Sequence, residues 1–369
     1  MNEDKAARFH RLQRRGAWVS LATQAAVMLA LVPGGWSVTI RDAAAAISRA
    51  SVSSALTVAT FTVLFLMLLE AVGLPQRFYR TFVLEHRYGL SAAPLRVWVS
   101  DHVKGLGLSL VLALAAAELV YFALAHWPQW WWAMTAVVAV AAIVVLAGLT
   151  PVVLLPMFYR FKPLDRAALI SRLEVLSRRA GVPVLGVYEW SLGDKSRRAN
   201  AALVGAGGNR RILLSDTLLE HYTDDEIEVI LAHELGHHVH RDIRNGLAIE
   251  SLVIVVACGV AAAALRLFWR PLGLEGPADV AGLPLLVLAT AVISLVSTPL
   301  VNAWSRRNEH RADRFALELT DRPDAFVSAM RRLAAQNLAE ARPSATTLWL
   351  FHTHPPFDER IQAARAFLS

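Results

Sequence analysis

The stretch LAHELGHHVHRD, from Leu231 to Asp242, contains four histidines and a glutamate, and the apolar run GLAIESLVIVVACGVAAAALRLFW follows it from Gly246 to Trp269. That run is longer than the roughly 20 apolar residues with which an α-helix crosses the ~30 Å hydrocarbon layer of a membrane. Polar residues of metal-binding types therefore lie directly beside a membrane-spanning segment. The sequence predicts an integral membrane protein that carries a polar site close to the bilayer.

The composition agrees with a membrane protein. Of the 369 residues, 55% are hydrophobic and 18% are charged, whereas soluble domains contain about 45–50% apolar and roughly 25% charged residues. Pro284 and Pro299 interrupt the last apolar segment, and such breaks are tolerated where protein or a water-filled cavity surrounds the backbone. The six predicted spans run from Gly16 to Pro33, Ala55 to Leu74, Gly105 to Trp127, Trp130 to Leu154, Gly246 to Leu265, and Ala281 to Trp304.

Lys and Arg residues beside the spans predict the orientation of the chain in the membrane. They are concentrated in the N-terminal tail and in the loop between the second and third spans, and they are sparse in the loops on the other side. Both termini are therefore expected in the cytoplasm. The chain divides into four parts: residues 1–156 with four spans and a cytoplasmic loop, 157–245 with the histidine cluster, 246–304 with two spans, and 305–369 on the cytoplasmic side.

Charge and cysteine content argue against nucleic-acid binding and against an internal disulfide. The net charge of +7 follows from the bias toward basic cytoplasmic loops, and no nucleic-acid-binding module is recognisable, so nucleic acid is not expected as a partner. The single cysteine, Cys258, lies inside an apolar span and cannot form an internal disulfide. It is expected to be a small buried hydrophobic residue.

The region before the histidine cluster predicts a small antiparallel β-sheet. Strand candidates run from Val184 to Trp190, Asn200 to Gly205 and Arg210 to Ser215, and a glycine-rich turn separates the last two. Thr223 and Glu226 then form the T-x-x-E pattern of a capping box, which predicts that the histidine cluster lies on a helix. The expected fold is an α-helical polytopic membrane protein with a metal-binding domain that contains this sheet.

His233 and His237 are four residues apart, so on a helix both imidazoles project from one face and can share a metal ion. Glu234 between them can reach a water at that metal as a general base, which is the H-E-x-x-H pattern of zinc hydrolases. The alternative is an ordinary polar helix face. His238 and His240 point elsewhere around the helix and are not counted as ligands.

A catalytic zinc ion takes three protein ligands and leaves one position open. In metzincins a second histidine, preceded by a glycine, follows the motif and supplies the third ligand, and neither residue follows His237 at the required spacing here. The best candidate is Glu309, on a helix that leaves the last span on the side of the histidines, although it could also be a surface carboxylate. Asp313, one turn further, could accept a hydrogen bond from a ligating imidazole. His310 and Arg311 are left unassigned.

Several motifs together resemble those of one family. VILAHELGHHVHRD, SRRNEHRADRFA, KSRRANAALVG, RRILLSDTLLE and THPPFDERI are similar, in matching order, to signatures of the type I CAAX prenyl protease family of integral-membrane zinc metalloproteases. LPQRFYRTFVLEHRYGLS resembles the segment ahead of that family's middle membrane helices. The resemblance covers roughly Leu74 to Ile361.

The resemblance implies a fold and roles for particular residues. It implies about six membrane helices that enclose a chamber, and one Zn²⁺ per chain. The substrate would be a peptide or protein, membrane-associated or lipidated. The short, Ala- and Arg-rich chain suggests a bacterial homologue in the inner membrane, with its active site reached from the cytoplasm. The residues to which the resemblance assigns roles are the zinc ligands His233, His237 and Glu309, the catalytic residues Glu234 and His354, and the substrate-binding residues Asn200, Ala201 and Arg360.

Three alternatives stay open at this point. A quality-control protease of the heat-shock membrane zinc family shares the zinc motif and the later glutamate, but TFVLEHRYG argues against it. A non-catalytic membrane scaffold would require the intact set of metal-site residues to be a relic. A transporter would use the interrupted sixth span as a discontinuous helix and would need charges inside the spans, for which Glu70, Glu118 and Glu250 are the candidates.

Overall fold

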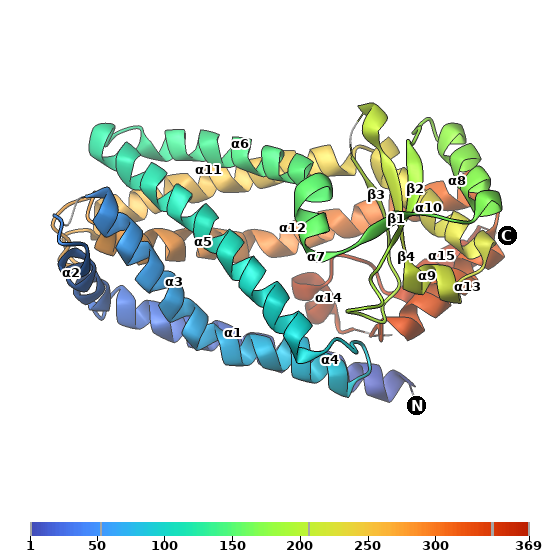
Figure 1. Ribbon diagram of the computed structural model, residues 1–369, viewed down its shortest axis with the longest axis horizontal. Coiled ribbons are helices and arrows are strands. Elements are labelled where there is room, and N and C mark those ends of the chain that lie inside the picture. Colours follow the sequence, from blue (N-terminus) through green and yellow to red (C-terminus); the bar gives the residue numbers. More distant parts are fainter. Residues whose placement is uncertain (1, 52–53, 206, 341–342, 368–369) are drawn as a thin grey trace.

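The computed structural model describes residues 2–51, 54–205, 207–340 and 343–367. Long helices run along the length of the molecule. The small sheet and most of the shorter helices form a domain at one end, where both chain termini also lie, while α2 (Trp36–Ser48) lies at the opposite end (Figure 1). The long helices are α1 (Asn2–Leu31), α3 (Ala55–Phe78), α5 (Leu95–His126), α6 (Trp131–Leu149), α11 (Asp242–Phe268) and α12 (Leu283–Thr320).

The number of membrane-spanning helices agrees with the prediction of about six. Among the described residues, five helices are long and apolar enough to cross a membrane, and a sixth is counted if α1 and α2 (Trp36–Ser48), separated by a 70° bend, form one span. The bend lies at Gly35, whose φ of 74° is a left-handed conformation that glycine adopts without strain. The first predicted span, Gly16 to Pro33, falls on α1 and extends two residues past the end of that helix at Leu31.

The expected interruption of the sixth span is wrong. α12 is continuous from Leu283 to Thr320, with Pro299 inside it. The hydroxyls of Ser297 and Thr298 donate to the backbone carbonyl of Ser294 within the helix, so the polar side chains next to the proline are satisfied without a break. One long helix therefore connects the membrane region to the domain that carries Glu309, and the discontinuous helix that would favour a transporter is absent from this described segment.

The sheet is mixed, not antiparallel as predicted. Its strands are β1 (Phe161–Pro163), β2 (Gly186–Trp190), β3 (Ala201–Val204) and β4 (Arg211–Ser215), in the spatial order β1-β2-β4-β3. The β3–β4 hairpin is antiparallel, but β4 pairs in parallel with β2, because residues 191–200 carry the chain back before β3 begins. β1 was not predicted. This order leaves β3 at an edge of the sheet, beside the histidine helix.

The core of the domain packs the sheet against helices from both halves of the chain. Among its largest fully buried side chains are Leu173 of α8 (Ala167–Arg179), Ile212 of β4 and Phe326 of α13 (Pro323–Gln336). Burying each such side chain contributes about 1.5–3 kcal/mol. The remaining helices are α4 (Leu84–Arg87), α7 (Leu155–Phe158), α9 (Asp216–His221), α10 (Asp224–Val239), α14 (Ala345–Phe351) and α15 (Phe357–Ala366).

The close packing of α10 on α12 depends on Gly236. A Cβ atom at this position would lie 3.1 Å from the Cα of Ala312 and 3.2 Å from Cδ1 of Phe315. Both distances are tighter than ordinary van der Waals contact, so a side chain here would push the two helices apart. Since α10 carries His233 and His237 and α12 carries Glu309, this contact sets the distance between the histidines and the glutamate.

Candidate metal centre

Three side chains from α10 and α12 converge on one point. Nε2 of His233 lies 3.2 Å from Nε2 of His237, and each of these nitrogens lies 3.4 Å from an oxygen of Glu309. A tetrahedral metal with ligand bonds of about 2.0–2.1 Å holds its ligand atoms about 3.3–3.4 Å apart. The two nitrogens thus have the spacing of two ligands around one ion, while each is 3.4 Å from a different oxygen of the Glu309 carboxylate. One ligand atom from each residue lies within 4.8 Å of the other two, so the three side chains form a candidate metal site.

Local sequence explains why α10 presents its histidines in this way. The predicted capping box is confirmed: Thr223 accepts from the backbone N–H of Glu226 at 3.3 Å, and Glu226 accepts from that of Thr223 at 2.8 Å. These bonds satisfy two of the donors that a helix start leaves unpaired. The helix then continues without a break to Val239, so that His233 and His237 lie one turn apart on the same face.

The residues present fit a metal cation. Oε2 of Glu309 is buried and accepts no hydrogen bond of suitable geometry from any described residue, although Nδ1 of His354 lies 2.8 Å away. A buried carboxylate oxygen without a hydrogen-bond partner raises the free energy of the folded state unless a cation or a hydrogen-bond donor satisfies it. Two imidazole nitrogens that face each other at 3.2 Å likewise need a shared cation or proton between them. Two imidazoles and one carboxylate form a ligand set typical of catalytic zinc.

Carboxylates behind the two histidines fix the orientation of both rings. Nδ1 of His233 lies 2.9 Å from Oδ1 of Asp313, which is the contact that the expected role of Asp313 requires. Asp313 is in turn held by Arg360, whose Nε and Nη2 donate to its two oxygens at 2.8 and 2.5 Å. Each imidazole that donates its Nδ1 proton to a carboxylate keeps Nε2 free for a metal.

Asp242 gives His237 the same support, and the sequence did not predict it. Oδ2 of Asp242 lies 2.9 Å from Nδ1 of His237, and Oδ1 accepts from Arg311 at 2.6 Å. α10 ends because Arg241 adopts a left-handed conformation with φ of 59°, and this turn directs Asp242, the first residue of α11, back toward His237. Arg311 also donates to Asn308 at 2.8 Å, so α12 supports this carboxylate.

Replacing Asp242 with asparagine is expected to weaken metal binding by about 10–100-fold, because such outer partners fix the ring and raise ligand basicity. Glu318 of α12, an exposed carboxylate paired with Arg314, provides the matched control, Glu318→Gln. Competition with a metal indicator dye at fixed pH measures the change. Unchanged affinity in Asp242→Asn would show that the Asp242–His237 contact does not support the site.

Protons compete with the metal at His233. Burial lowers the pKa of this imidazole, but the neighbouring carboxylates of Asp313 and Glu309 outweigh it, so that the pKa of His233 in the metal-free chain is raised to about 9. A ligating imidazole must be neutral. Metal binding at neutral pH must therefore displace a proton, and metal affinity falls as the pH is lowered.

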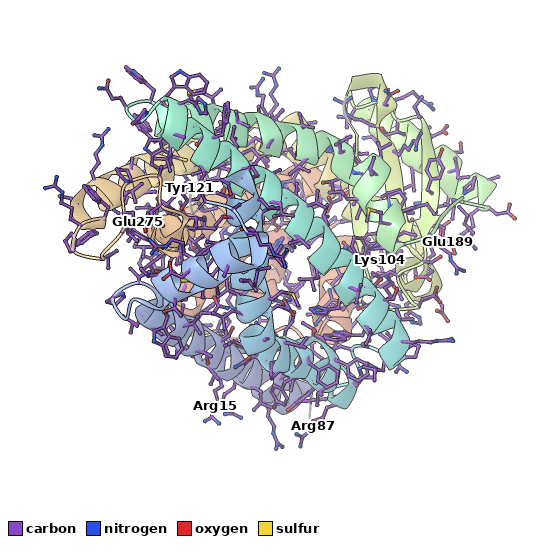
Figure 2. All side chains as sticks on the ribbon, turned by 60° about the vertical axis from the view of Figure 1, so that its left-hand side comes forward. Arg15, Arg87, Lys104, Tyr121, Glu189 and Glu275 are labelled. Carbon is purple, nitrogen blue, oxygen red and sulfur yellow. The ribbon has the colours of Figure 1, made fainter. Side chains whose placement is uncertain are left out.

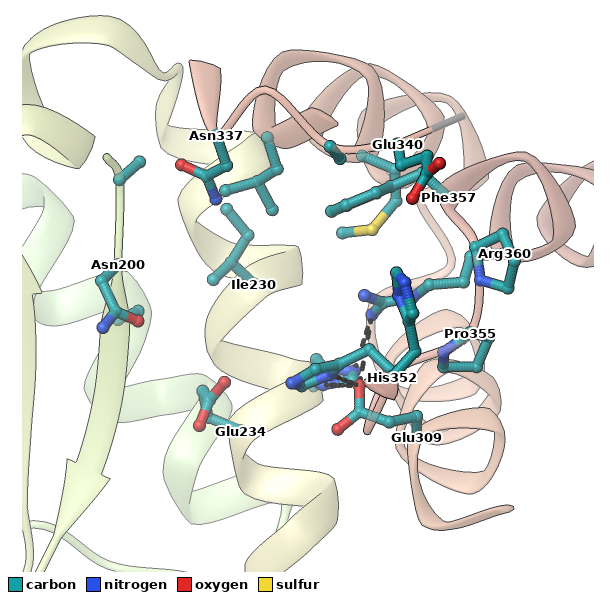
Figure 3. A pocket seen from close by; sticks show the side chains of 18 of the residues that line it. Asn200, Ile230, Glu234, Glu309, Asn337, Glu340, His352, Pro355, Phe357 and Arg360 are labelled. Atoms are coloured by element: carbon teal, nitrogen blue, oxygen red, sulfur yellow. Dashed lines mark hydrogen bonds and ion pairs between the residues drawn. The ribbon is translucent and has the colours of Figure 1, made fainter. Parts of the chain in front are cut away.

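Glu234 faces a cavity between α10, β3 and the C-terminal segment. Figure 3 shows Glu234 with Asn200 on one side and Glu309 on the other, and the cavity, of about 400 Å³, is also lined by Ala201, His354 and Arg360. A second hollow of about 280 Å³ shares Glu234 and Glu309 and extends to Trp304 and Ile243. Burial raises the pKa of the Glu234 carboxyl, which is the direction expected for a general base.

The other predicted site residues also lie around this cavity. Asn200 immediately precedes β3, and its backbone N–H donates to the Ser215 hydroxyl at 2.9 Å. The His354 side chain is 63% exposed and contacts Glu309 from the cavity side. Arg360 lines the cavity but is itself buried, and its guanidinium is engaged by Asp313. Its contacts show that it holds Asp313, and the substrate binding expected of it stays a prediction.

The remaining histidines of the cluster have other partners. His238 Nε2 lies 3.0 Å from the backbone carbonyl of Leu203 in β3, and the ring of His240 contacts Phe315. His310 lies 3.4 Å from Glu359. None of the three belongs to the group of side chains that could hold a metal among the described residues.

Comparisons with known proteins agree with this geometry. The family model of peptidase family M48 matches residues 163–368, and that described as CAAX prenyl protease N-terminal, five membrane helices, matches residues 3–160. The chain is similar to the uncharacterized metalloprotease YhfN of Bacillus subtilis (strain 168), with 32% identity over 281 residues, which cover 75% of this chain and 66% of that protein. The aligned part thus spans about two thirds of that relative's length.

A eukaryotic relative and a solved structure extend the likeness over most of the chain. The probable CAAX prenyl protease 1 of Schizosaccharomyces pombe is 28% identical over 340 residues, which cover 87% of this chain and 68% of that protein. The crystal structure of S. mikatae Ste24p matches with a TM-score of 0.88 and 22% identity, and covers 98% of this chain and 89% of that one. At that identity the structural likeness shows the shared fold.

Proposed function

The chain belongs to peptidase family M48 and is an integral-membrane metalloprotease, and on this premise we propose that it is an endopeptidase with one zinc ion at His233, His237 and Glu309. The observation that supports the proposal is the convergence of these three side chains, whose ligand atoms lie within 4.8 Å of one another, with the carboxylate of Glu234 beside them in the same cavity. When bound, zinc supplies a Lewis acid that polarises a carbonyl and lowers the pKa of water.

The chain's own residues supply the proton transfers and the positioning. Glu234 accepts a proton from the attacking water and delivers it to the leaving nitrogen, a role suited to a carboxylate with a raised pKa. His354 is the proposed donor to the oxyanion. Because it is largely exposed and contacts Glu309 in the free protein, it must turn toward the substrate to do so. Asp313 and Asp242 keep the two ligating rings in place.

The free edge of β3 is the proposed binding site for the peptide backbone. The N–H of Ser215 donates to the carbonyl of Asn200, so Asn200 and every second residue after it direct their backbone N–H and C=O groups toward β4. Ala201 and Leu203 alternate with them and point theirs away from the sheet. His238 already occupies the carbonyl of Leu203. A peptide added as a further strand would therefore pair chiefly with the N–H and carbonyl of Ala201.

Backbone N-methylation of a substrate tests this pairing. A methyl group on the one amide that donates to the Ala201 carbonyl is expected to raise KM about tenfold, because it removes a hydrogen bond and adds a clash at the strand edge. Methylation at the amide two residues away, opposite the occupied Leu203 carbonyl, is expected to have little effect. Equal tolerance at every position would contradict strand addition.

We propose that the substrate is a lipidated peptide at the membrane, on the evidence of the second hollow, which shares Glu234 and Glu309 with the main cavity. This hollow reaches Trp304 in the membrane-leaving part of α12, and relatives of the chain are named CAAX prenyl proteases. A lipidated peptide could lie with its chain toward Trp304 while its backbone pairs with β3. We propose that the membrane is a bacterial inner membrane and that the site lies on its cytoplasmic side, which the basic loops beside the spans support. The four-part division of the chain remains part of this proposal.

The experiment offers the protein, reconstituted in vesicles, an S-farnesylated peptide that ends in a CAAX sequence and the same peptide without the lipid. Mass spectrometry of the products should show hydrolysis of a peptide bond near the modified cysteine, faster for the lipidated form. Equal rates would remove the lipid from the proposal and leave the peptidase. No cleavage of either peptide by zinc-loaded protein would count against both.

A further inference from the structure

A groove between α1 and α14 lies outside the metal site. Arg11, Arg15 and Trp18 occupy successive turns of one face of α1, and Thr347 and Phe351 face them from α14 across a hollow of about 310 Å³. The basic part of α1 precedes the first predicted span, and Trp18 lies just inside it. The groove is therefore at the boundary where headgroups meet the hydrocarbon layer, on the same side as the metal site.

The part of the groove lined by Arg11 and Arg15 carries positive charge that no described acidic residue neutralises. Arg14 also lines it, but its guanidinium is neutralised by Glu340, to which it donates at 2.5 and 3.2 Å. Arg11 and Arg15 are exposed and form no ion pair with any described residue. Two free guanidiniums one helical turn apart, with threonine hydroxyls opposite, suit a phosphate group, which accepts hydrogen bonds from several such donors.

The part of the groove lined by Trp18 and Phe351 is apolar. The rings of Trp18 and Phe351 pack edge to face with their centroids 5.9 Å apart, and Leu350 adds to the same wall. Trp18 and Phe351 are nevertheless 53% and 44% exposed. Aromatic side chains at this depth favour the membrane interface. Positive charge above an apolar wall matches the order of groups in a phospholipid, with the phosphate above the acyl chains.

We propose that this groove binds one anionic phospholipid, with its phosphate between Arg11 and Arg15 and its glycerol and first acyl carbons against Trp18 and Phe351. Figure 2 shows Arg15 projecting outward from α1, free to meet a headgroup. α14 is held from the other side, because Arg306 of α12 donates to the backbone carbonyls of Leu348 and His352 at 3.1 and 2.7 Å. A bound lipid thus bridges α1 to the segment that leads into His352 and His354. The proposal does not depend on the peptidase activity.

Native mass spectrometry of the full chain tests it, with phosphatidylglycerol as the probe and phosphatidylcholine as the neutral comparison. The protein is expected to retain phosphatidylglycerol selectively, and the double variant Arg11→Gln, Arg15→Gln is expected to bind it about tenfold or more weakly, since each arginine near an anionic surface contributes appreciably to binding. The matched control is Arg87→Gln, Arg96→Gln, which removes the same charge from two exposed arginines that form no ion pair with a described residue. It should bind like the unaltered protein.

A second pair of measurements separates a lipid site from a site for free phosphate. Glycerol 3-phosphate should not displace the lipid at concentrations equal to it, and Trp18→Ala should weaken lipid retention about threefold or more through the lost apolar contact. If the control double variant lost as much lipid as Arg11→Gln, Arg15→Gln, the binding would depend on the overall surface charge and not on this groove, which would overturn the proposal. Displacement by glycerol phosphate, with no effect of Trp18→Ala, would overturn it in favour of a phosphate site.

Discussion

Replacing Glu234 with glutamine is expected to lower the rate of peptide hydrolysis by about 10²–10⁴-fold while the metal content stays unchanged, because a general base contributes rate acceleration of that size. Glutamine has the same shape but cannot accept the proton of the attacking water. Glu234 forms no ion pair with a described residue, so the change should leave the packing of α10 intact.

The measurement is kcat with any peptide that the unaltered protein cleaves, together with metal content and the melting temperature. Glu228→Gln is the matched control, because Glu228 lies on the same helix and pairs with Arg172 away from the cavity. It should keep nearly full activity. Substantial activity in Glu234→Gln would assign the base to another group and would contradict the proposed mechanism.

Replacing Glu309 with alanine is expected to lower metal affinity by more than about 100-fold, since loss of an outer partner alone typically costs 10–100-fold. Only two imidazoles would remain, and hydrolysis should be lost with the metal. The control is Glu318→Ala on the same helix, where an exposed carboxylate pairs with Arg314. In the metal-free chain Glu309 also pairs with His233, whose pKa is raised, so Glu309→Ala removes one partner of a buried ion pair and is expected to lower the stability of the folded metal-free protein as well.

Affinity by competition with an indicator dye, followed by thermal unfolding with and without metal, distinguishes the two effects. The unaltered protein should gain thermal stability on metal addition, and Glu309→Ala should gain little. If Glu309→Ala bound metal as tightly as the unaltered protein, the third ligand would lie elsewhere, and the site would need a different residue set.

Features that depend on local spacing could be predicted from the sequence. His233 and His237 lie on one helical face because four residues separate them, and the capping box at Thr223 fixes where that helix begins. The membrane spans likewise follow from composition over about 20 residues. Glu309 needed more than spacing, since its approach to the histidines depends on how α12 packs against α10 at Gly236.

Features that depend on long-range pairing could not be predicted. The parallel pairing of β2 with β4 follows from the path of residues 191–200, and the sequence of that segment has no hydrophobic periodicity from which its path could be predicted. Asp242 stands inside the opening sequence stretch, yet its role required the left-handed turn at Arg241, an uncommon conformation for a residue other than glycine. The pairing of the buried Arg360 guanidinium with Asp313 was not predicted either, because the two residues are 47 positions apart in the sequence.

The most direct test of the central claim is elemental analysis of the purified protein, prepared without added metal and assayed for its melting temperature in the same sample. About one zinc per folded chain, removed by a chelator and restored by zinc salts, is the result that three ligands around one ion predict. A well-folded preparation that contains no stoichiometric metal, and that gains neither metal nor stability when zinc is supplied, would contradict the account and leave His233, His237 and Glu309 without a catalytic role.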